Sequence, residues 1–99
     1  KMGKVNFKQE KNTVLAQIIG DCDEIQLAVI KTRLVEFIKS SNHTIYLHIE
    51  ECKKLDEVFV RTLVQLHTIA KKMGGGISLL SSEPEIQSLF KKLDKDQSI

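Results

Sequence analysis

The strongest constraint on the fold is a helical segment between two apolar, β-branched segments. Thr13 to Ile19 and Thr44 to Ile49 have the Val, Ile and Leu content of buried strands. Residues 24–39 between them repeat apolar side chains at helical spacing, namely Leu27, Ile30, Leu34, Phe37 and Ile38. Two strands joined by one helix almost always lie parallel, with a right-handed crossover. The sequence therefore predicts an α/β sheet built on this unit.

The other elements extend this sheet on both sides. A short strand from Val5 to Gln9, followed by a polar turn, predicts a hairpin with the strand from Thr13 and places the first strand at a sheet edge. A second helix is expected from Asp56 to the glycines at 74–76, where a left-handed helix end requires glycine. A fourth strand is expected from Ile77 to Leu80.

The chain is expected to end in a third helix. Ser82 and Glu85 have the spacing of a capping box, with Pro84 in the first turn. The inward side chains are predicted to be Ile86, Leu89, Phe90 and Leu93. Residues 94–99 are expected to be a frayed tail, and residues 1–3 an added or disordered start. The prediction is a single α/β domain over 1–99, with a four-stranded mixed sheet and three helices mainly on one face.

The start of the second helix is unusually acidic. Asp56 is the expected N-cap, and Glu57 follows it at the positive end of the helix dipole. Asp23 is the expected cap of the first helix. The inward positions of the second helix are Phe59, Leu63, Leu66, Ala70 and Met73. A second row, Val60, Val64 and His67, either extends the core or forms a contact surface, and we favour the core.

Composition excludes several function classes. The 99 residues carry a net charge of +2, with 41% hydrophobic and 28% charged residues, as in an ordinary globular domain. No run of Lys and Arg exceeds two residues and aromatic residues are few, so no nucleic-acid partner is expected. No segment has the apolar length of a membrane span or the pattern of a signal peptide, which predicts a cytoplasmic protein without membrane insertion.

Residues with catalytic or metal-binding chemistry are scattered. They are His43, His48, His67, Cys22 and Cys52. The two cysteines follow adjacent parallel strands and could lie close together near Asp23 and Asp56, but they lack the spacing of zinc motifs. The glycines at 74–76 follow a helix, whereas a phosphate-binding loop precedes one. We therefore expect no metal, no cofactor and no enzymatic activity.

Two short segments resemble motifs of a known family. Gly20-Asp21-Cys22-Asp23 ends the second strand, and Leu55-Asp56 opens the second helix, as in STAS domains of bacterial anti-sigma-factor antagonists and sulfate transporters. Further positions agree with the family pattern along nearly the whole chain: Leu63, Leu66, Ala70, Gly74, Gly75, Ile77, Leu79, Pro84, Ile86 and Leu89.

The chain departs from this family at the regulatory position. Antagonists of the family carry a phosphorylatable Ser directly after the Asp, and Glu57 occupies that position here, followed by Val58 and Phe59. The resemblance thus implies that no serine switch operates at this position. Glu57 either imitates phosphoserine with a permanent charge or marks a lost site where Glu suits a helix start, and we favour the lost site.

The resemblance implies a non-enzymatic, bacterial, cytoplasmic interaction domain in signalling and transcription regulation. Its expected partner is an anti-sigma factor, a serine kinase or a larger regulatory complex, and a homodimer is also possible. The expected contact residues are Asp23, Asp56, Glu57, Val58, Val60, Arg61 and Val64. The alternatives are a small STAS subunit of a lipid-transport ATPase, or a small-ligand or nucleotide binder at the helix N-termini. The acidic pair at Asp56 and Glu57 would repel an anionic ligand.

Overall fold

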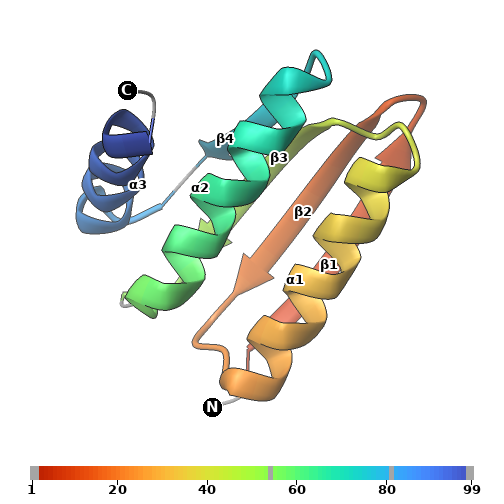
Figure 1. The fold of residues 1–99 in the computed structure, drawn as a ribbon. Coiled ribbons are helices and arrows are strands. Elements are labelled where there is room, and N and C mark those ends of the chain that lie inside the picture. The colour runs from red at the N-terminus through yellow and green to blue at the C-terminus, as the bar shows by residue number, and fades with distance from the viewer. Residues whose placement is uncertain (1–2, 54, 81, 98–99) are drawn as a thin grey trace.

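The computed structural model describes residues 3–53, 55–80 and 82–97, and it contains the predicted elements in the predicted order (Figure 1). They are β1 (Lys4–Glu10), β2 (Thr13–Ile19), α1 (Glu24–Lys39), β3 (Thr44–Glu50), α2 (Glu57–Lys72), β4 (Gly76–Leu80) and α3 (Pro84–Gln97). Every observed boundary of a strand lies within one residue of its prediction.

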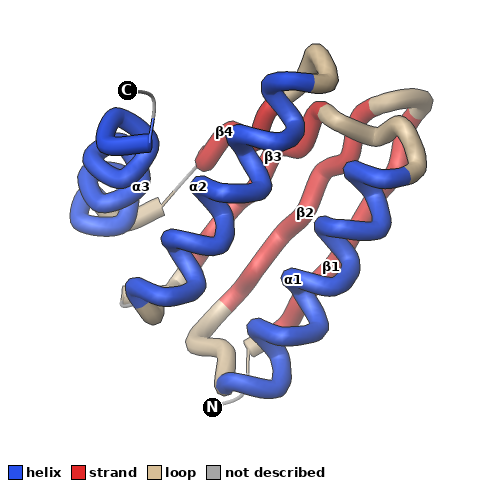
Figure 2. The backbone as a smooth tube through the Cα atoms, viewed as in Figure 1, coloured by secondary structure: helices blue, strands red, loops and turns tan. Residues whose placement is uncertain are grey.

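The sheet has the strand order β1-β2-β3-β4. β1 and β2 pair antiparallel, and β2 with β3 and β3 with β4 pair parallel. Figure 2 shows α1 and α2 side by side in front of the sheet, with α3 beside α2. The predicted fold class, a single α/β domain with a mixed four-stranded sheet and three helices, is therefore confirmed.

The two faces of the sheet differ in burial because side chains alternate along each strand. The face toward α1 and α2 carries the fully or nearly fully buried residues Val14, Ala16, Ile18, Ile45, Leu47, Ile49 and Ile77. Leu15 and Tyr46, which are register partners on the opposite face, are both exposed. In the described part of the chain, helices cover only one face of the sheet.

The end of α2 is a Schellman motif. The Gly74 amide donates to the Lys71 carbonyl at 3.0 Å, and the Gly75 amide donates to the Ala70 carbonyl at 2.8 Å. Gly74 has a φ of 95°, as the predicted left-handed helix end requires. Met73 was expected to face inward. This prediction is wrong, because Met73 occupies the C-cap, where the helix ends, and its side chain is exposed.

The start of α3 also differs from the prediction. Pro84 is the first helical residue, so the cap position is Glu83, whose carbonyl accepts the Ile86 amide at 3.0 Å. The Ser82 hydroxyl is buried without a hydrogen-bond partner. The predicted capping box of Ser82 with Glu85 is therefore wrong, because proline at the first helical position shifts the cap by one residue.

The two ends of the chain extend further into the fold than expected. Gly3 is buried, and its carbonyl accepts a hydrogen bond from the Gln26 side chain at 2.7 Å. Gly3 is therefore part of the fold, and the expectation of an added or disordered start is wrong for this residue. At the other end, α3 continues through residues 94–97 of the expected frayed tail. Residues 1–2 and 98–99 lie outside the described residues.

Candidate protein-interaction site

The candidate site lies where β2 and β3 end. Because these strands are parallel, both of the loops that follow them leave the same edge of the sheet. Ile19 and Glu50 are register partners, and the Gly20 amide donates to the Glu50 carbonyl at 2.8 Å. α1 and α2 both begin just beyond these loops. The structure thus places Asp23 and Asp56, the caps of the two helices, at one end of the sheet.

Both aspartates act as the predicted caps. The Asp23 carboxylate accepts the Gln26 amide at 2.8 Å, and the Gln26 side chain accepts the Asp23 amide at 3.0 Å, which completes a capping box. The Asp56 carboxylate accepts the Val58 amide at 2.7 Å. Both aspartates are exposed, so each carboxylate stabilises its helix and is also accessible to a partner.

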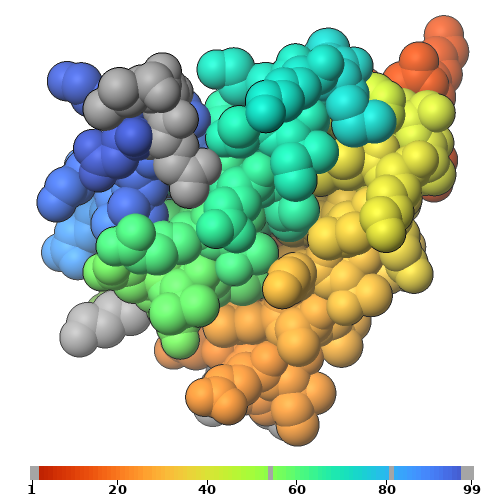
Figure 3. All heavy atoms as spheres, viewed as in Figure 1, coloured from red at the N-terminus to blue at the C-terminus, as the bar shows by residue number. Residues whose placement is uncertain are grey.

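A groove of about 330 Å³ lies between the first turns of α1 and α2. It is lined by Glu24, Leu27, Ala28, Lys31, Asp56, Val58, Phe59 and Thr62. Figure 3 shows the two helix starts next to each other, α1 in orange and α2 in green. Val58 lines this groove and is 70% exposed. The groove thus combines apolar residues with charged residues of both signs, Glu24, Asp56 and Lys31.

Glu57 and Arg61 form an ion pair on the exposed side of α2. The Arg61 Nη2 atom lies 2.8 Å from the Glu57 Oε2 atom, and about half of each side chain is exposed. This is the (i, i+4) spacing at which opposite charges meet on a helix, and such an exposed pair stabilises a helix by only a few tenths of a kcal/mol. The pair nevertheless means that Arg61 partly neutralises the charge at position 57.

Two predicted contact residues lie in the core. Val60 and Val64 have no exposed surface, so neither can touch a partner. This confirms the favoured expectation that their row on α2 extends the core, and Phe59 is buried as expected. We call the remaining predicted residues the corner surface: Asp23, Asp56, Glu57, Val58 and Arg61.

The structure adds residues of α1 that the sequence analysis missed. Leu27, Ala28, Lys31 and Glu24 line the groove from the α1 side. Leu27 was assigned to the core, but it is only partly buried. The parallel pairing of β2 and β3 was the available signal, since it brings the starts of both helices together.

The surroundings of Cys22, next to the cap residue Asp23, disfavour its thiolate form. Cys22 is partly buried, Cys52 is buried, and neither forms a disulfide. Burial and then the charges of Asp23 and Asp21 raise the pKa of the Cys22 thiol. A raised pKa keeps the thiol protonated near neutral pH, and a protonated thiol is a poor nucleophile.

Within residues 3–53, 55–80 and 82–97, no group of three or more His, Cys, Asp and Glu side chains is arranged to hold a metal ion. None of the helices in this part of the chain combines the length and apolar character needed to cross a membrane.

Comparison with known structures identifies the fold. The chain is similar to the unphosphorylated form of the anti-sigma-factor antagonist SpoIIAA, with a TM-score of 0.74 and 16% sequence identity. The alignment covers 93% of this chain and 84% of that protein. At the level of sequence, neither the protein-family models nor the curated proteins gave a match. The fold is therefore that of an anti-sigma-factor antagonist, the STAS fold.

Proposed function

We propose that this chain is a non-enzymatic regulatory domain that binds a protein partner through the corner surface and the adjoining groove. The observation that carries the proposal is Val58, an aliphatic side chain 70% exposed beside a groove, in a fold shared with an anti-sigma-factor antagonist. An apolar centre with polar and charged groups around it is the usual composition of a protein interface, and Val58 lies beside Leu27, Ala28 and Phe59 in the lining of the groove.

The charges at the corner favour a protein partner over a small anion. Asp23, Glu24, Asp56 and Glu57 surround the two helix N-termini that would otherwise attract a phosphate or a nucleotide. The cap carboxylates already accept amide hydrogens there, so fewer donors remain for a ligand. A partner with an apolar side chain for the groove and basic groups around it would match this surface.

The fold suggests the kind of partner. SpoIIAA is an anti-sigma-factor antagonist, and by analogy we propose that the partner is an anti-sigma factor or a related serine kinase in the bacterial cytoplasm. Such a partner would meet a surface that does not depend on serine phosphorylation at position 57, because that residue is Glu.

We further propose that Glu57 marks a lost phosphorylation site. Phosphoserine carries a charge of about −1.5 to −2, whereas Glu57 carries one charge and shares it with Arg61 at 2.8 Å. The ion pair therefore reduces the negative potential that a phosphoserine mimic would need. On this reading, Glu57→Ser leaves partner binding nearly unchanged.

The test uses affinity capture from a lysate of the source organism, followed by mass spectrometry. The unaltered chain is compared with Val58→Asp, Arg61→Glu and Glu57→Ser. Ile69→Asp is the matched control, because Ile69 is a 48% exposed aliphatic residue on the same helix. An anti-sigma factor or kinase is expected with the unaltered chain, with Ile69→Asp and with Glu57→Ser.

Val58→Asp is expected to reduce capture by about tenfold or more, the effect of losing one central contact of about 1.4 kcal/mol. Arg61→Glu replaces a positive charge of the corner surface by a negative one and is expected to reduce capture in the same experiment. Equal recovery with Val58→Asp and Ile69→Asp would contradict the assignment of the site. Equal recovery with a serine at position 57 would support the lost site, and a strong change would support the mimic.

A further inference from the structure

The outer edge of β1 offers a second surface, which differs from the corner surface because it consists of the backbone groups of an edge strand. β1 is the first strand of the sheet, and all seven of its residues pair with β2 on the inner side. No other described strand pairs with its outer side. An edge strand of this length presents unpaired amide and carbonyl groups to another chain. Proteins commonly protect such edges with lysine, and β1 contains Lys4 and Lys8.

The sequence of β1 is complementary to itself in one register. When a two-fold axis perpendicular to the sheet relates two antiparallel copies of one strand, opposite side chains point to the same face of the sheet. Because side chains alternate between the faces, two opposite residues are both odd-numbered or both even-numbered, and their numbers add to an even sum. Pairing centred on Phe7 uses the whole strand and places Lys4 opposite Glu10 of the second copy, twice. The uncharged Asn6 then faces Lys8, and no like charges oppose each other.

The neighbouring registers are worse. Pairing centred on Asn6 uses only residues 4–8 and places Lys4 opposite Lys8, twice. Pairing centred on Lys8 uses only residues 6–10 and places that lysine opposite its own copy. Like charges directly opposite destabilise a strand pair, and unlike charges stabilise it. The register centred on Phe7 is thus the longest of the three and the one with favourable charges.

The geometry points to a homodimer in which two copies pair through β1. We propose that the two strands are antiparallel, centred on Phe7, and join the two sheets into one continuous sheet. The two-fold axis would then be perpendicular to the sheet, so both α1 helices lie on the same face, facing each other across the axis.

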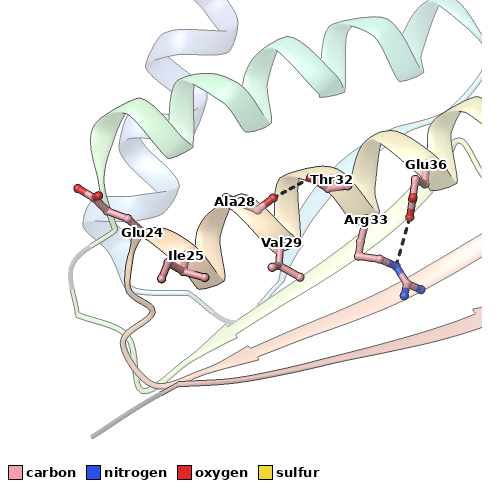
Figure 4. A pocket seen from close by; sticks show the side chains of 7 residues that line it. All are labelled: Glu24, Ile25, Ala28, Val29, Thr32, Arg33 and Glu36. Atoms are coloured by element: carbon pink, nitrogen blue, oxygen red, sulfur yellow. Dashed lines mark hydrogen bonds and ion pairs between the residues drawn. The ribbon is translucent and has the colours of Figure 1, made fainter.

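The outer side of α1 has the composition that this arrangement requires. A hollow of about 490 Å³ on α1 is lined by Glu24, Ile25, Ala28, Val29, Thr32, Arg33 and Glu36. Ile25 is 76% exposed and Val29 54% exposed. Figure 4 shows both side chains on the side of α1 that faces away from α2. They form an exposed apolar stripe on the helix that would approach its copy.

Arg33 connects this stripe to the edge strand. Its guanidinium carbon lies 5.1 Å from the centre of the Phe7 ring and 5.0 Å from the centre of the Phe37 ring. Its Nε atom also lies 3.8 Å from the Glu36 carboxylate (Figure 4). The stripe and the centre of β1 are therefore on the same side of the molecule and form one continuous surface for a second copy.

The test measures the dimer dissociation constant by sedimentation equilibrium of the whole chain from micromolar to millimolar concentrations. Lys4→Glu creates two Glu–Glu pairs in the dimer, one on each side of the axis, and Glu10→Lys creates two Lys–Lys pairs. Each single variant is therefore expected to weaken the dimer about tenfold or more. The double variant Lys4→Glu, Glu10→Lys restores both unlike pairs and is expected to recover most of the affinity. Lys91→Glu on α3 is the control for net charge.

The apolar stripe is tested separately. Val29→Glu is expected to weaken the dimer, whereas Ile69→Glu, an exposed aliphatic position on α2, is expected to leave it unchanged. Circular dichroism checks that each variant is folded. A chain that stays monomeric at every concentration overturns the proposal, and so does a dimer that the single charge variants do not weaken. A double variant no tighter than the single variants overturns the register.

Discussion

At the scale of single residues, His67 joins three elements. Its Nδ1 atom accepts the Ile77 amide of β4 at 2.9 Å, and its ring lies 5.5 Å from the Phe90 ring of α3. Its Nε2 atom lies 3.7 Å from the Asp94 carboxylate. Burial lowers the pKa of His67, while Asp94 acts in the opposite direction and Lys71 adds to the lowering. The folded chain therefore favours the neutral ring, which can accept the Ile77 amide.

This lowered pKa predicts acid sensitivity. The unfolded chain binds a proton at His67 at a higher pH than the folded chain, so stability falls as pH decreases below the ordinary His pKa of about 6.5. When His67 is fully protonated, it can no longer accept the Ile77 amide, and we expect the free energy of unfolding of the unaltered chain to decrease by about 1 kcal/mol. Urea unfolding at neutral pH and at about pH 5 should show a smaller decrease for His67→Gln. An equal decrease in both proteins would contradict this role.

Gly75 is required by a close backbone contact. A Cβ atom at this position would overlap the carbonyl group of His43, and the same loop is fixed by a hydrogen bond from the Gly76 amide to the His43 carbonyl at 2.8 Å. Gly74 differs, because a Cβ there meets nothing within 4 Å and the cost comes only from its φ of 95°.

Substitution of these two glycines should separate the two effects. Gly75→Ala is expected to destabilise the fold by about 2 kcal/mol or more, since backbone must move. Gly74→Ala is expected to cost about 1 kcal/mol, the usual penalty for a left-handed residue with a side chain. Thermal and urea unfolding would measure both. A larger loss for Gly74→Ala would contradict the contact with His43.

At the scale of elements, the caps fix where the helices begin. Capping residues were predictable at Asp23 and Asp56 because each directly precedes an amphipathic pattern. At α3 two signals conflicted, since Ser82 and Glu85 have capping-box spacing while Pro84 suits the first helical position. Proline decided the start, because its fixed φ fits the first turn and its missing amide costs nothing there.

Asp56 caps α2 through a hydrogen bond and also carries a negative charge at the helix start, and two substitutions separate these contributions to stability. Asp56→Ala removes the acceptor for the Val58 amide and is expected to destabilise the fold by about 1 kcal/mol. Asp56→Asn retains an acceptor and removes only the charge, so it should preserve stability to within a few tenths of a kcal/mol. Urea unfolding compares the two variants. If both were equally destabilised, the charge of Asp56 would matter more than its hydrogen bond.

At the scale of the whole molecule, the topology followed from sequence because two rules acted together. Strand periodicity and the right-handed crossover placed β2 and β3 side by side, and the hairpin placed β1 at the edge. The surface was less predictable. A helical pattern gives the direction of Val60 and Val64 relative to their own helix, but their burial depends on neighbouring elements, and the sequence does not specify how closely these approach.

The position of α3 predicts uneven protection across the molecule. It is attached through Ile86, Phe90 and Leu93 beside α2, whereas β2 and β3 lie in the middle of the sheet. We expect amide hydrogens of α3 to exchange at least roughly tenfold faster than those of β3, because a peripheral helix can open without the sheet. Hydrogen exchange followed by mass spectrometry would measure this. Equal protection would show that α3 opens only with the whole domain.

The hydrogen bond between Gly20 and Glu50 has a consequence for recognition. It joins the first residue after β2 to the last residue of β3, so the two points at which the chain leaves the sheet toward Asp23 and Asp56 are held together. If the proposed partner binds at the corner, it would meet two helix starts anchored at the same edge of the sheet, and less conformational entropy would be lost on association than at freely moving loops. Complex formation at the corner should then resemble the docking of two rigid bodies, with small changes in backbone position.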